Sequence, residues 1–498
     1  MALSLYNTLT RRKEPFTPLE PGTVKLYCCG VTVYDYCHLG HARSYIAWDT
    51  ARRYLLWQGY QVQYVQNFTD IDDKILNRAR QEQCSMETIS QRYTQAYFED
   101  MARLNILEAD AYTYATQTLD GIKRLIAELE QKGFAYATGG DVYYAVRKFD
   151  GYGKLSGRKL DDMQAGASGR VPASATQSTL DGPQKQDPFD FALWKAAKPE
   201  EPAWESPWGP GRPGWHIECS AMVQEQFGPT IDIHMGGADL VFPHHENEIA
   251  QSEAASGHPL AHYWLHNGMV NVGGEKMSKS LGNFTTIRAL LDDAPGAPSP
   301  MALRLFVLQA QYRKPIDFTD GAISSAKNGW ATLQEGLRFG FEHGEQLGWS
   351  EAALPEASTL DRHSPAVQPA VQQFEAAMDD DLNTSGALAV LFELAKELRR
   401  VGNVITHQGR VDGDAADLHQ QWQTLVVLAQ VLGLEAEPEA VSTDVDTLSD
   451  GAIEDLLAQR QAARQAKDFA EGDRLRDLLQ SQGITLIDKP GGVTDWHR

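Results

Sequence analysis

The sequence has no uninterrupted run of about 18 apolar residues, the length that a membrane-spanning helix needs. Its first residues also lack the apolar segment and small-residue cleavage site of a secretory signal, and Arg11, Arg12 and Lys13 follow soon after them. We therefore expect a protein that stays in the cytoplasm and has no membrane partner.

Cysteine is scarce. The 498 residues include five, an odd number: Cys28, Cys29, Cys37, Cys84 and Cys219. A chain that is not exported keeps its thiols reduced, so we expect free thiols or metal ligands here rather than disulfides.

Positive charge is in the minority. The 45 lysines and arginines face 67 aspartates and glutamates, which gives a net charge of −22. This imbalance argues against a general nucleic-acid-binding protein, because contacts to phosphates need lysine and arginine. It still permits RNA binding through a small basic surface on an otherwise acidic protein.

The first part of the chain has the pattern of a strand, a helix and a second strand. Residues 24–29 read as a strand, apolar residues recur at helical spacing from Ala42 to Leu55, and residues 61–66 alternate as a strand. Such βαβ units build a doubly wound parallel sheet of the Rossmann type, which binds its ligands beyond the carboxyl ends of the strands. The predicted fold class is α/β.

The remaining chain divides by composition. Residues 140–214 are irregular apart from a short strand at 141–147, and we interpret them as an insertion between two halves of the sheet. After residue 317 the pattern is typical of bundle helices, residues 435–450 look like an acidic linker, and a last helix is expected at 452–482. The predicted domains are 1–135 (first half of the sheet domain), 136–214 (insertion), 215–320 (second half), 321–435 (helical bundle) and 436–498 (linker and small helical unit).

Two short motifs suit the binding of a nucleotide. Segment 276–280, Lys-Met-Ser-Lys-Ser, places two lysines three residues apart among serines and near glycines, which makes a cationic loop for phosphates. Segment 38–41, His-Leu-Gly-His, supplies two imidazoles around a glycine at the start of a helix, where the helix dipole attracts phosphate. Each motif is short, so the prediction depends on finding both in this order.

A third pattern suits a metal ion. On a predicted helix that begins with proline, His244 and Glu248 are four residues apart and share a face, and His245 is the competing imidazole. Together with Cys29 and Cys219 they would offer two thiolates, one imidazole and one carboxylate, a set that suits tetrahedral zinc. The spacing alone leaves open that both cysteines are buried apolar residues and that His244 caps the helix.

Over nearly its whole length the chain resembles the cysteinyl-tRNA synthetases, a family of class I aminoacyl-tRNA synthetases. Leu39 stands where the general class pattern has isoleucine, an exchange of one apolar residue for another. The matching segments are 27–35, 38–41, 67–74, 211–220, 242–248 and 276–280.

The resemblance implies an enzyme that activates L-cysteine with ATP as cysteinyl-adenylate and transfers it to the cysteine-specific tRNA, tRNA(Cys). It implies one zinc ion on Cys29, Cys219, His244 and Glu248, which would select a thiolate over the serine hydroxyl. It also implies Mg²⁺ with ATP and an anticodon-binding role for the helical bundle. We expect a monomer.

Further roles are implied by the same resemblance. Asp72, Asp73 and Lys74 could be read as metal ligands or a catalytic carboxylate pair, but we interpret them as the charged start of a helix. The implied residues are His38, His41, Lys276 and Lys279 for catalysis; His38, Gly40, His41, Gly237, Asp239 and Lys279 for ATP; and Thr32, Trp215 and His234 for the substrate.

Three other functions share parts of this pattern. A ligase that transfers cysteine to an amino sugar would use the same catalytic core, but it would not need the long helical region after residue 320. A non-catalytic zinc protein that only binds tRNA would not need both phosphate-binding motifs. A zinc hydrolase would carry two histidines four residues apart beside a glutamate, an order that residues 244–248 lack.

Overall fold

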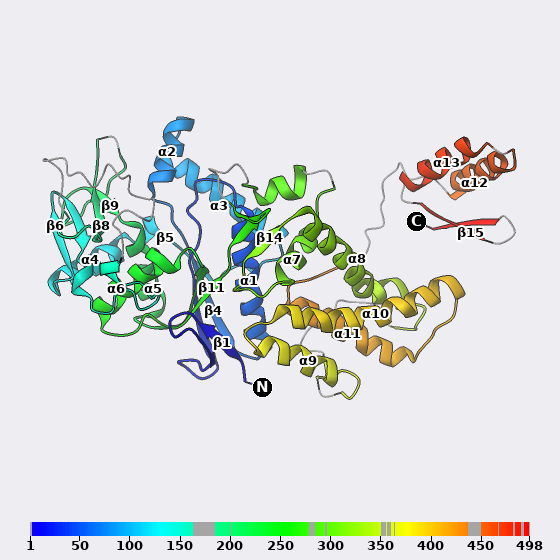
Figure 1. Cartoon of the computed structure of the whole chain (residues 1–498), viewed down its shortest axis with the longest axis horizontal. Coiled ribbons are helices and arrows are strands. Elements are labelled where there is room, and N and C mark those ends of the chain that lie inside the picture. Colours follow the sequence, from blue (N-terminus) through cyan, green and yellow to red (C-terminus); the bar gives the residue numbers. More distant parts are fainter. Residues whose placement is uncertain are drawn as a thin grey trace. The chain divides into compact units, whose positions relative to one another are not determined.

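Figure 1 shows the computed structural model of the chain. The chain forms two compact units, Met1–Ala436 and Glu437–Arg498, which are described separately. No helix in the part of the chain covered by this description is long and apolar enough to cross a membrane. The structure describes residues 2–162, 185–199, 201–277, 284–293, 296–349, 355, 360–362, 364–436, 450–466, 468–481, 484–489 and 493–497.

A five-stranded parallel sheet lies at the centre of the first unit. Its strand order is β11–β10–β3–β4–β5, and every neighbouring pair is parallel. The chain order reverses between β3 and β10, so a crevice is expected where these two strands end. The doubly wound sheet predicted from the sequence is therefore confirmed. The strands are β3 (Thr23–Cys28), β4 (Gln61–Phe68), β5 (Ala111–Tyr114), β10 (Ile231–Gly237) and β11 (Ala261–Asn267).

Helices connect these strands. Helix α1 crosses from β3 to β4 and ends before Gly59, whose φ of 87° is accessible to glycine at little cost. Asp72 caps helix α2 by accepting from the Lys74 amide, as expected for a charged helix start. The helices are α1 (Leu39–Trp57), α2 (Asp73–Glu82), α3 (Met86–Arg103), α4 (Leu119–Gln131), α5 (Trp215–Phe227) and α6 (Glu246–Ser256).

The insertion is more regular than its sequence indicates. Besides the expected strand, which is β7, three more strands complete a four-stranded antiparallel sheet of order β6–β7–β8–β9. These strands are short and lie between segments rich in glycine and proline, so their periodicity was too brief to read. They are β6 (Ala135–Thr138), β7 (Asp141–Tyr144), β8 (Phe191–Ala196) and β9 (Gly211–Pro213).

The first unit ends in a helical bundle, at the opposite end from the insertion sheet (Figure 1). Two smaller sheets, the β1–β2 hairpin and a sheet of order β13–β12–β14, flank the parallel sheet domain. The helices are α7 (Pro300–Leu308), α8 (Asp320–His343), α9 (Gln368–Asp379), α10 (Thr384–Gln408) and α11 (Ala415–Val431); the strands are β1 (Ser4–Asn7), β2 (Arg12–Pro15), β12 (Val270–Val272), β13 (Glu275–Lys276) and β14 (Ile316–Phe318).

The second unit differs from the single helix expected at 452–482. Two helices, α12 (Asp450–Gln465) and α13 (Phe469–Ser481), replace it, followed by a hairpin of β15 (Thr485–Lys489) and β16 (Val493–His497). Asp468 causes the break, because its side chain accepts from the Glu471 amide and so starts a new helix.

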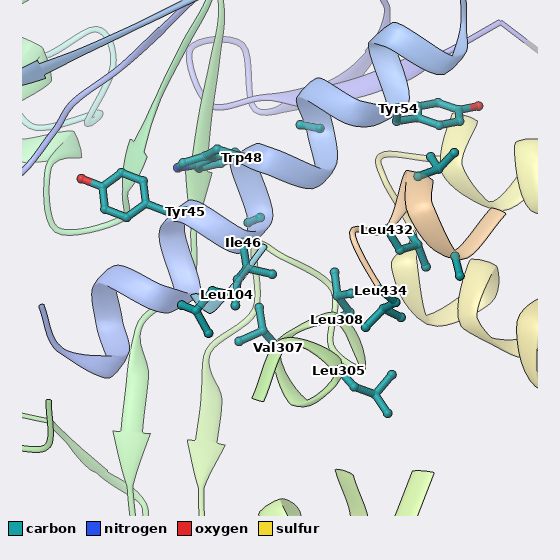
Figure 2. Close-up of a cluster of buried hydrophobic side chains, with 14 of the residues drawn as sticks. Tyr45, Ile46, Trp48, Tyr54, Leu104, Leu305, Val307, Leu308, Leu432 and Leu434 are labelled. Atoms are coloured by element: carbon teal, nitrogen blue, oxygen red, sulfur yellow. The ribbon is translucent and has the colours of Figure 1, made fainter. Parts of the chain in front are cut away.

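A buried apolar cluster joins helix α1 to the bundle. Figure 2 shows side chains of α1 and α7 meeting the segment that follows α11. Ile46, Leu305, Leu432 and Leu434 are fully buried, and each such side chain contributes roughly 1.5–3 kcal/mol to folding. The parallel sheet domain and the bundle therefore share one core.

An ion pair lies within this joint. The Arg304 guanidinium is fully buried and donates to the Asp49 carboxylate of α1. It also donates to the backbone oxygens of Leu432, at 2.7 Å, and Leu104, at 2.9 Å. Burial opposes ionisation of Asp49, but Arg304 and Arg53 outweigh it and hold the pKa of that carboxyl below its usual value.

Two aspartates, Asp379 and Asp381, form a second joint at the end of α9. The Tyr54 hydroxyl donates to Asp379 at 2.7 Å. The Tyr312 hydroxyl and the Arg313 Nε donate to buried Asp381 at 3.0 and 2.7 Å. The bundle is thus tied to α1 and to the segment that follows α7.

We predict that Arg304→Leu lowers the free energy of unfolding at pH 7 by about 3–5 kcal/mol, because Asp49 is left buried without its main partner. Asp49 has a lower pKa in the folded than in the unfolded state, so it stabilises the fold above its ordinary pKa of 3.8. That contribution is lost as the pH falls through the folded-state pKa. Urea unfolding followed by tryptophan fluorescence from pH 7 to pH 3 measures both effects.

The control is Arg124→Leu, which removes an exposed partner of Glu225 and should cost at most about 1 kcal/mol. Equal losses in the two variants would contradict the assigned role of Arg304.

Candidate functional site

Four metal-binding side chains meet at the carboxyl edge of the parallel sheet. Cys29 directly follows β3, Cys219 lies in α5, and His244 and Glu248 lie on either side of the start of α6. All four are buried, and their ligand atoms lie within 4.8 Å of one another. We call these four residues the donor cluster.

The distances within the donor cluster fit one small metal ion. The two sulfurs are 3.9 Å apart, Cys219 Sγ is 3.6 Å from His244 Nε2, and Cys29 Sγ is 3.5 Å from Glu248 Oε1. Tetrahedral zinc with Zn–S bonds of about 2.3 Å would separate two sulfurs by roughly 3.8 Å. The donor cluster can therefore hold a metal.

The helix that carries Glu248, α6, begins later than expected. Glu246 is its first residue, and one separate turn, Val241–His245, precedes it, because Phe242 has extended rather than helical dihedral angles. His244 Nε2 still lies 2.9 Å from Glu248 Oε1, so the expected pairing on one face is present.

A second set of donors overlaps the first. Cys29, His234, His245 and Glu248 also bring ligand atoms within 4.8 Å of one another. His245 Nε2 is 3.3 Å from Cys29 Sγ, and its Nδ1 is 2.8 Å from His266 Nε2. The imidazole that competed with His244 in the sequence therefore also borders the cluster.

Neighbouring groups shift the protonation of the donors. A hydrogen bond from the Cys29 thiol lowers the pKa of Cys219 to about 6, whereas burial raises the pKa of Cys29 itself. Burial opposes the charged form of His244, yet the Glu248 carboxylate raises its pKa to about 9. Burial likewise opposes ionised Glu248, but His234 and His244 hold its pKa well below the usual range. The low pKa values of Cys219 and Glu248 therefore favour the thiolate and carboxylate forms, which are the forms that bind metals.

Further side chains orient His244. Its Nδ1 lies 2.9 Å from Nδ1 of His216, and the ring of Trp215 stacks on it at 4.2 Å between centroids. Gln251 in turn donates to the backbone oxygen of His216 at 2.8 Å. Such contacts to the second nitrogen of a ligating imidazole fix its orientation.

A loop of the insertion holds the first turn of α6. The carboxylate of fully buried Glu246 accepts from the amides of Gly153 at 2.9 Å and Ser156 at 2.8 Å. The Tyr152 hydroxyl donates to Asn247 at 2.5 Å. The insertion therefore positions the helix that carries Glu248.

A cleft opens beside the donor cluster, between the ends of β3 and β10. Cys29 lines it, so the cluster and the cleft share a wall. The residues predicted from the sequence that also line this cleft are Thr32, His38, Gly40, His41, Trp215, Gly237 and Asp239.

The His-Leu-Gly-His segment forms the first turn of α1. His38 is the N-cap, its Nδ1 accepts from the Gly40 amide at 3.0 Å, and its own amide donates to His41 Nδ1 at 3.3 Å. The two rings stack with centroids 3.7 Å apart. Both imidazoles thus sit where the partial positive charge of the helix end faces the cleft.

Three predicted site residues, His234, Lys276 and Lys279, are not among the described residues that line the cleft. His234 is fully buried, does not line the cleft, and places Nε2 2.8 Å from Glu248 Oε2. The backbone of Lys276 is in β13, and Lys279 falls outside the described residues. The chain beyond that loop returns to the cleft, where the ring of Phe284 lies 5.2 Å from His38.

Sequence reasoning missed several contributors. Tyr34, Ser44, Lys74 and Asn267 line the cleft, and His266 supports His245. Lys74 was interpreted only as part of a charged helix start. The available signal for Asn267 was its position at the end of an apolar strand, where parallel sheets bind ligands.

Comparison with known proteins supplies the family. The model described as "tRNA synthetases class I (C) catalytic domain" matches residues 15–328, a DALR domain matches 373–437, and "Cysteinyl-tRNA ligase anticodon binding domain" matches 448–494. Cysteine–tRNA ligases of Synechococcus elongatus and Gloeothece citriformis are 70% and 65% identical, over 100% of both chains in each case. The chain belongs to the class I cysteine–tRNA ligases.

Solved structures of more distant class I ligases share the fold. Methionyl-tRNA synthetase of Mycobacterium tuberculosis in complex with methionyl-adenylate has a TM-score of 0.53 at 17% identity, covering 82% of this chain and 89% of that one. A putative arginyl-tRNA synthetase of Campylobacter jejuni has a TM-score of 0.51 at 13% identity, covering 85% and 94%.

We predict that Gly40→Ala slows ligation by about 100-fold at limiting ATP, because a misplacement of about 1 Å at an active site can cost that much. A Cβ at position 40 would lie only 2.7 Å from Cε1 of the His38 ring and displace it. Initial rates of tRNA charging at several ATP concentrations measure the effect. Gly321→Ala is the control, since a Cβ there meets no atom within 4 Å; a similar loss in both variants would contradict the prediction.

Proposed function

We propose that this ligase attaches L-cysteine to tRNA(Cys) through a cysteinyl-adenylate, with zinc in the donor cluster selecting cysteine. The observation that carries the proposal is that Cys29 belongs to the donor cluster, which could hold a metal, and also lines the cleft, which has the features of a nucleotide site. A cysteine bound there would have its side chain toward the donor cluster and its carboxylate toward the nucleotide.

The donor set favours zinc on Cys29, Cys219, His244 and Glu248 over the overlapping set with His245. Two thiolates in place of one suit a metal with tetrahedral sulfur and nitrogen preference. When bound, zinc would supply a soft Lewis acid that prefers a thiolate to a hydroxyl. Discrimination by one missing methylene in an apolar pocket reaches only about 1–3 kcal/mol.

The remaining roles in amino-acid binding follow from position. Thr32 and Trp215 line the cleft next to ligand positions, so we propose that they contact the substrate. His234 would act through Glu248, which it touches, by keeping that carboxylate ionised and fixed.

The nucleotide site would use the first turn of α1 and the loop after β10. His38, Gly40 and His41 would hold the phosphates, with Gly237 and Asp239 beside the adenosine, and Mg²⁺ would accompany ATP. Lys276 and Lys279 would neutralise the charge that develops on the leaving pyrophosphate.

The reaction would proceed in two steps. The cysteine carboxylate attacks the α-phosphate of ATP, which releases pyrophosphate and leaves cysteinyl-adenylate. A ribose hydroxyl of the terminal adenosine of tRNA then takes the cysteinyl group and AMP leaves. The protein contributes mainly by positioning the reactants and stabilising charge.

The other regions would bind the rest of the tRNA. We propose a sheet domain in two halves, 1–135 and 215–320, separated by the insertion 136–214. The unit 436–498 would contact the anticodon arm, as the description of its matching family model supports, and the bundle 321–435 would share this role by the family resemblance. The enzyme would act as a cytoplasmic monomer.

We predict that Cys219→Ser loses bound zinc and affinity for cysteine together, because a neutral hydroxyl replaces a thiolate whose pKa is low. Zinc per chain by atomic emission and the KM for cysteine measure the two losses. The matched control is Cys84→Ser, at a half-buried thiol outside the donor cluster. Full zinc content and unchanged KM in Cys219→Ser would refute the assignment.

We predict that Lys279→Ala slows adenylate formation by at least about 100-fold, the loss expected when one charge-stabilising group is removed. Cysteine-dependent exchange of pyrophosphate into ATP measures this step, and an unchanged thermal unfolding midpoint shows that the variant folds. Near-wild-type exchange would exclude the role.

The decisive experiment is charging of tRNA(Cys) with labelled cysteine and ATP, with pyrophosphate exchange measured alongside. Both activities are expected. Exchange without charging would point to a ligase with another acceptor, and the absence of both would point to a binding protein.

A further inference from the structure

Positive charge is concentrated in a groove that the reaction at the cleft does not use. The groove lies between the turn of the β1–β2 hairpin and residues 147–161, the loop that holds α6. Five cations and two carboxylates line it, in a protein whose net charge is −22. They are Arg11, Arg147, Lys154, Arg158 and Lys159, with Asp150 and Asp161.

Two of these cations already have acidic partners. Arg147 pairs with Asp161 at 2.9 Å and with Asp187 at 2.5 Å, and Lys154 pairs with Glu253. These ion pairs stiffen the loop and anchor it to α6.

The other three cations have no ion pair with any residue that the structure describes. Arg11, Arg158 and Lys159 are exposed, and they come from two segments far apart in the sequence. The Arg158 guanidinium lies 4.5 Å from the centroid of the Phe242 ring, which helps to fix its position. The Arg11 guanidinium packs against Gly157, where a Cβ would come within 1.8 Å of it. Three cations without an ion pair to any described residue are thus gathered on one surface.

We propose that this groove binds the sugar–phosphate backbone of the tRNA substrate. Cations spread over two segments suit the repeated phosphates of a polyanion better than a single small anion. The overall negative charge would repel RNA from most other parts of the surface and so favour this one. The inference rests on the proposed function, which supplies the RNA.

The groove would also bring the RNA close to the cysteine site. The same loop donates its Gly153 and Ser156 amides to Glu246, the first residue of the helix that carries Glu248. RNA on the outer side of the loop would therefore rest on the element that positions the donor cluster.

The test compares two double variants of the full-length protein. Arg11→Ala with Lys159→Ala removes two groove cations, whereas Arg12→Ala with Lys148→Ala removes two exposed cations from the same two segments that do not line the groove. The dissociation constant of a tRNA(Cys) transcript is measured by filter binding at several salt concentrations. The groove variant should bind roughly tenfold more weakly, with a salt slope smaller by about one per lost phosphate contact. The control should stay within about twofold.

Cysteine-dependent pyrophosphate exchange without RNA should be unchanged in both variants, which shows that folding and the cleft are intact. An unchanged dissociation constant and salt slope in the groove variant would overturn the proposal, and so would an equal loss in the control. Loss of exchange in the groove variant would assign these residues to the structure of the loop instead. Failure of the wild-type protein to exchange pyrophosphate while it still binds tRNA through the groove would refute the proposed function but not this surface.

Discussion

The first unit depends on bringing three ionisable acids together out of water. Cys29, Cys219 and Glu248 are buried within a few ångströms of one another, and their charged forms repel. Imidazoles of His234 and His244 compensate by direct contact with the Glu248 carboxylate. A divalent cation in the same place would compensate more completely, because it can be bonded by both thiolates at once. The packing of α5 and α6 against the ends of β3 and β10 is what holds these groups at bonding distance.

Buried charges with compensating partners also join the parallel sheet domain to the bundle. Arg304 is as deeply buried as the apolar side chains around it, and its donors are shared between Asp49 and backbone oxygens. Asp381 repeats the arrangement with the sign reversed, since a buried carboxylate accepts from Tyr312 and Arg313. Both joints involve α1, which lines the cleft, or the segment after α7. Movement of the bundle would therefore displace residues that line the cleft.

Periodicity in the sequence was sufficient for β3, β4, α1 and the bundle helices, because the apolar patterns of these elements are regular. It failed for β6, β8 and β9, which are too short to show a period, and for the break at Asp468, where a cap interrupts a helical pattern. Family resemblance identified the residues that the structure brings together in the donor cluster and the cleft. It could not supply His216, His266 or the loop bonded to Glu246, because these contacts depend on how distant segments pack. The sequence also did not reveal that α6 begins at Glu246, because this start depends on the extended conformation of Phe242.

The donor cluster draws on residues separated by 219 positions, from Cys29 to Glu248. During synthesis the first thiol leaves the ribosome long before the last carboxylate, with the whole insertion between them. Contacts so distant in sequence form late, after local helices and hairpins. A nascent chain therefore cannot present all four donors to a metal ion until both halves of the sheet have closed. Metal loading would therefore mark the completion of the parallel sheet domain.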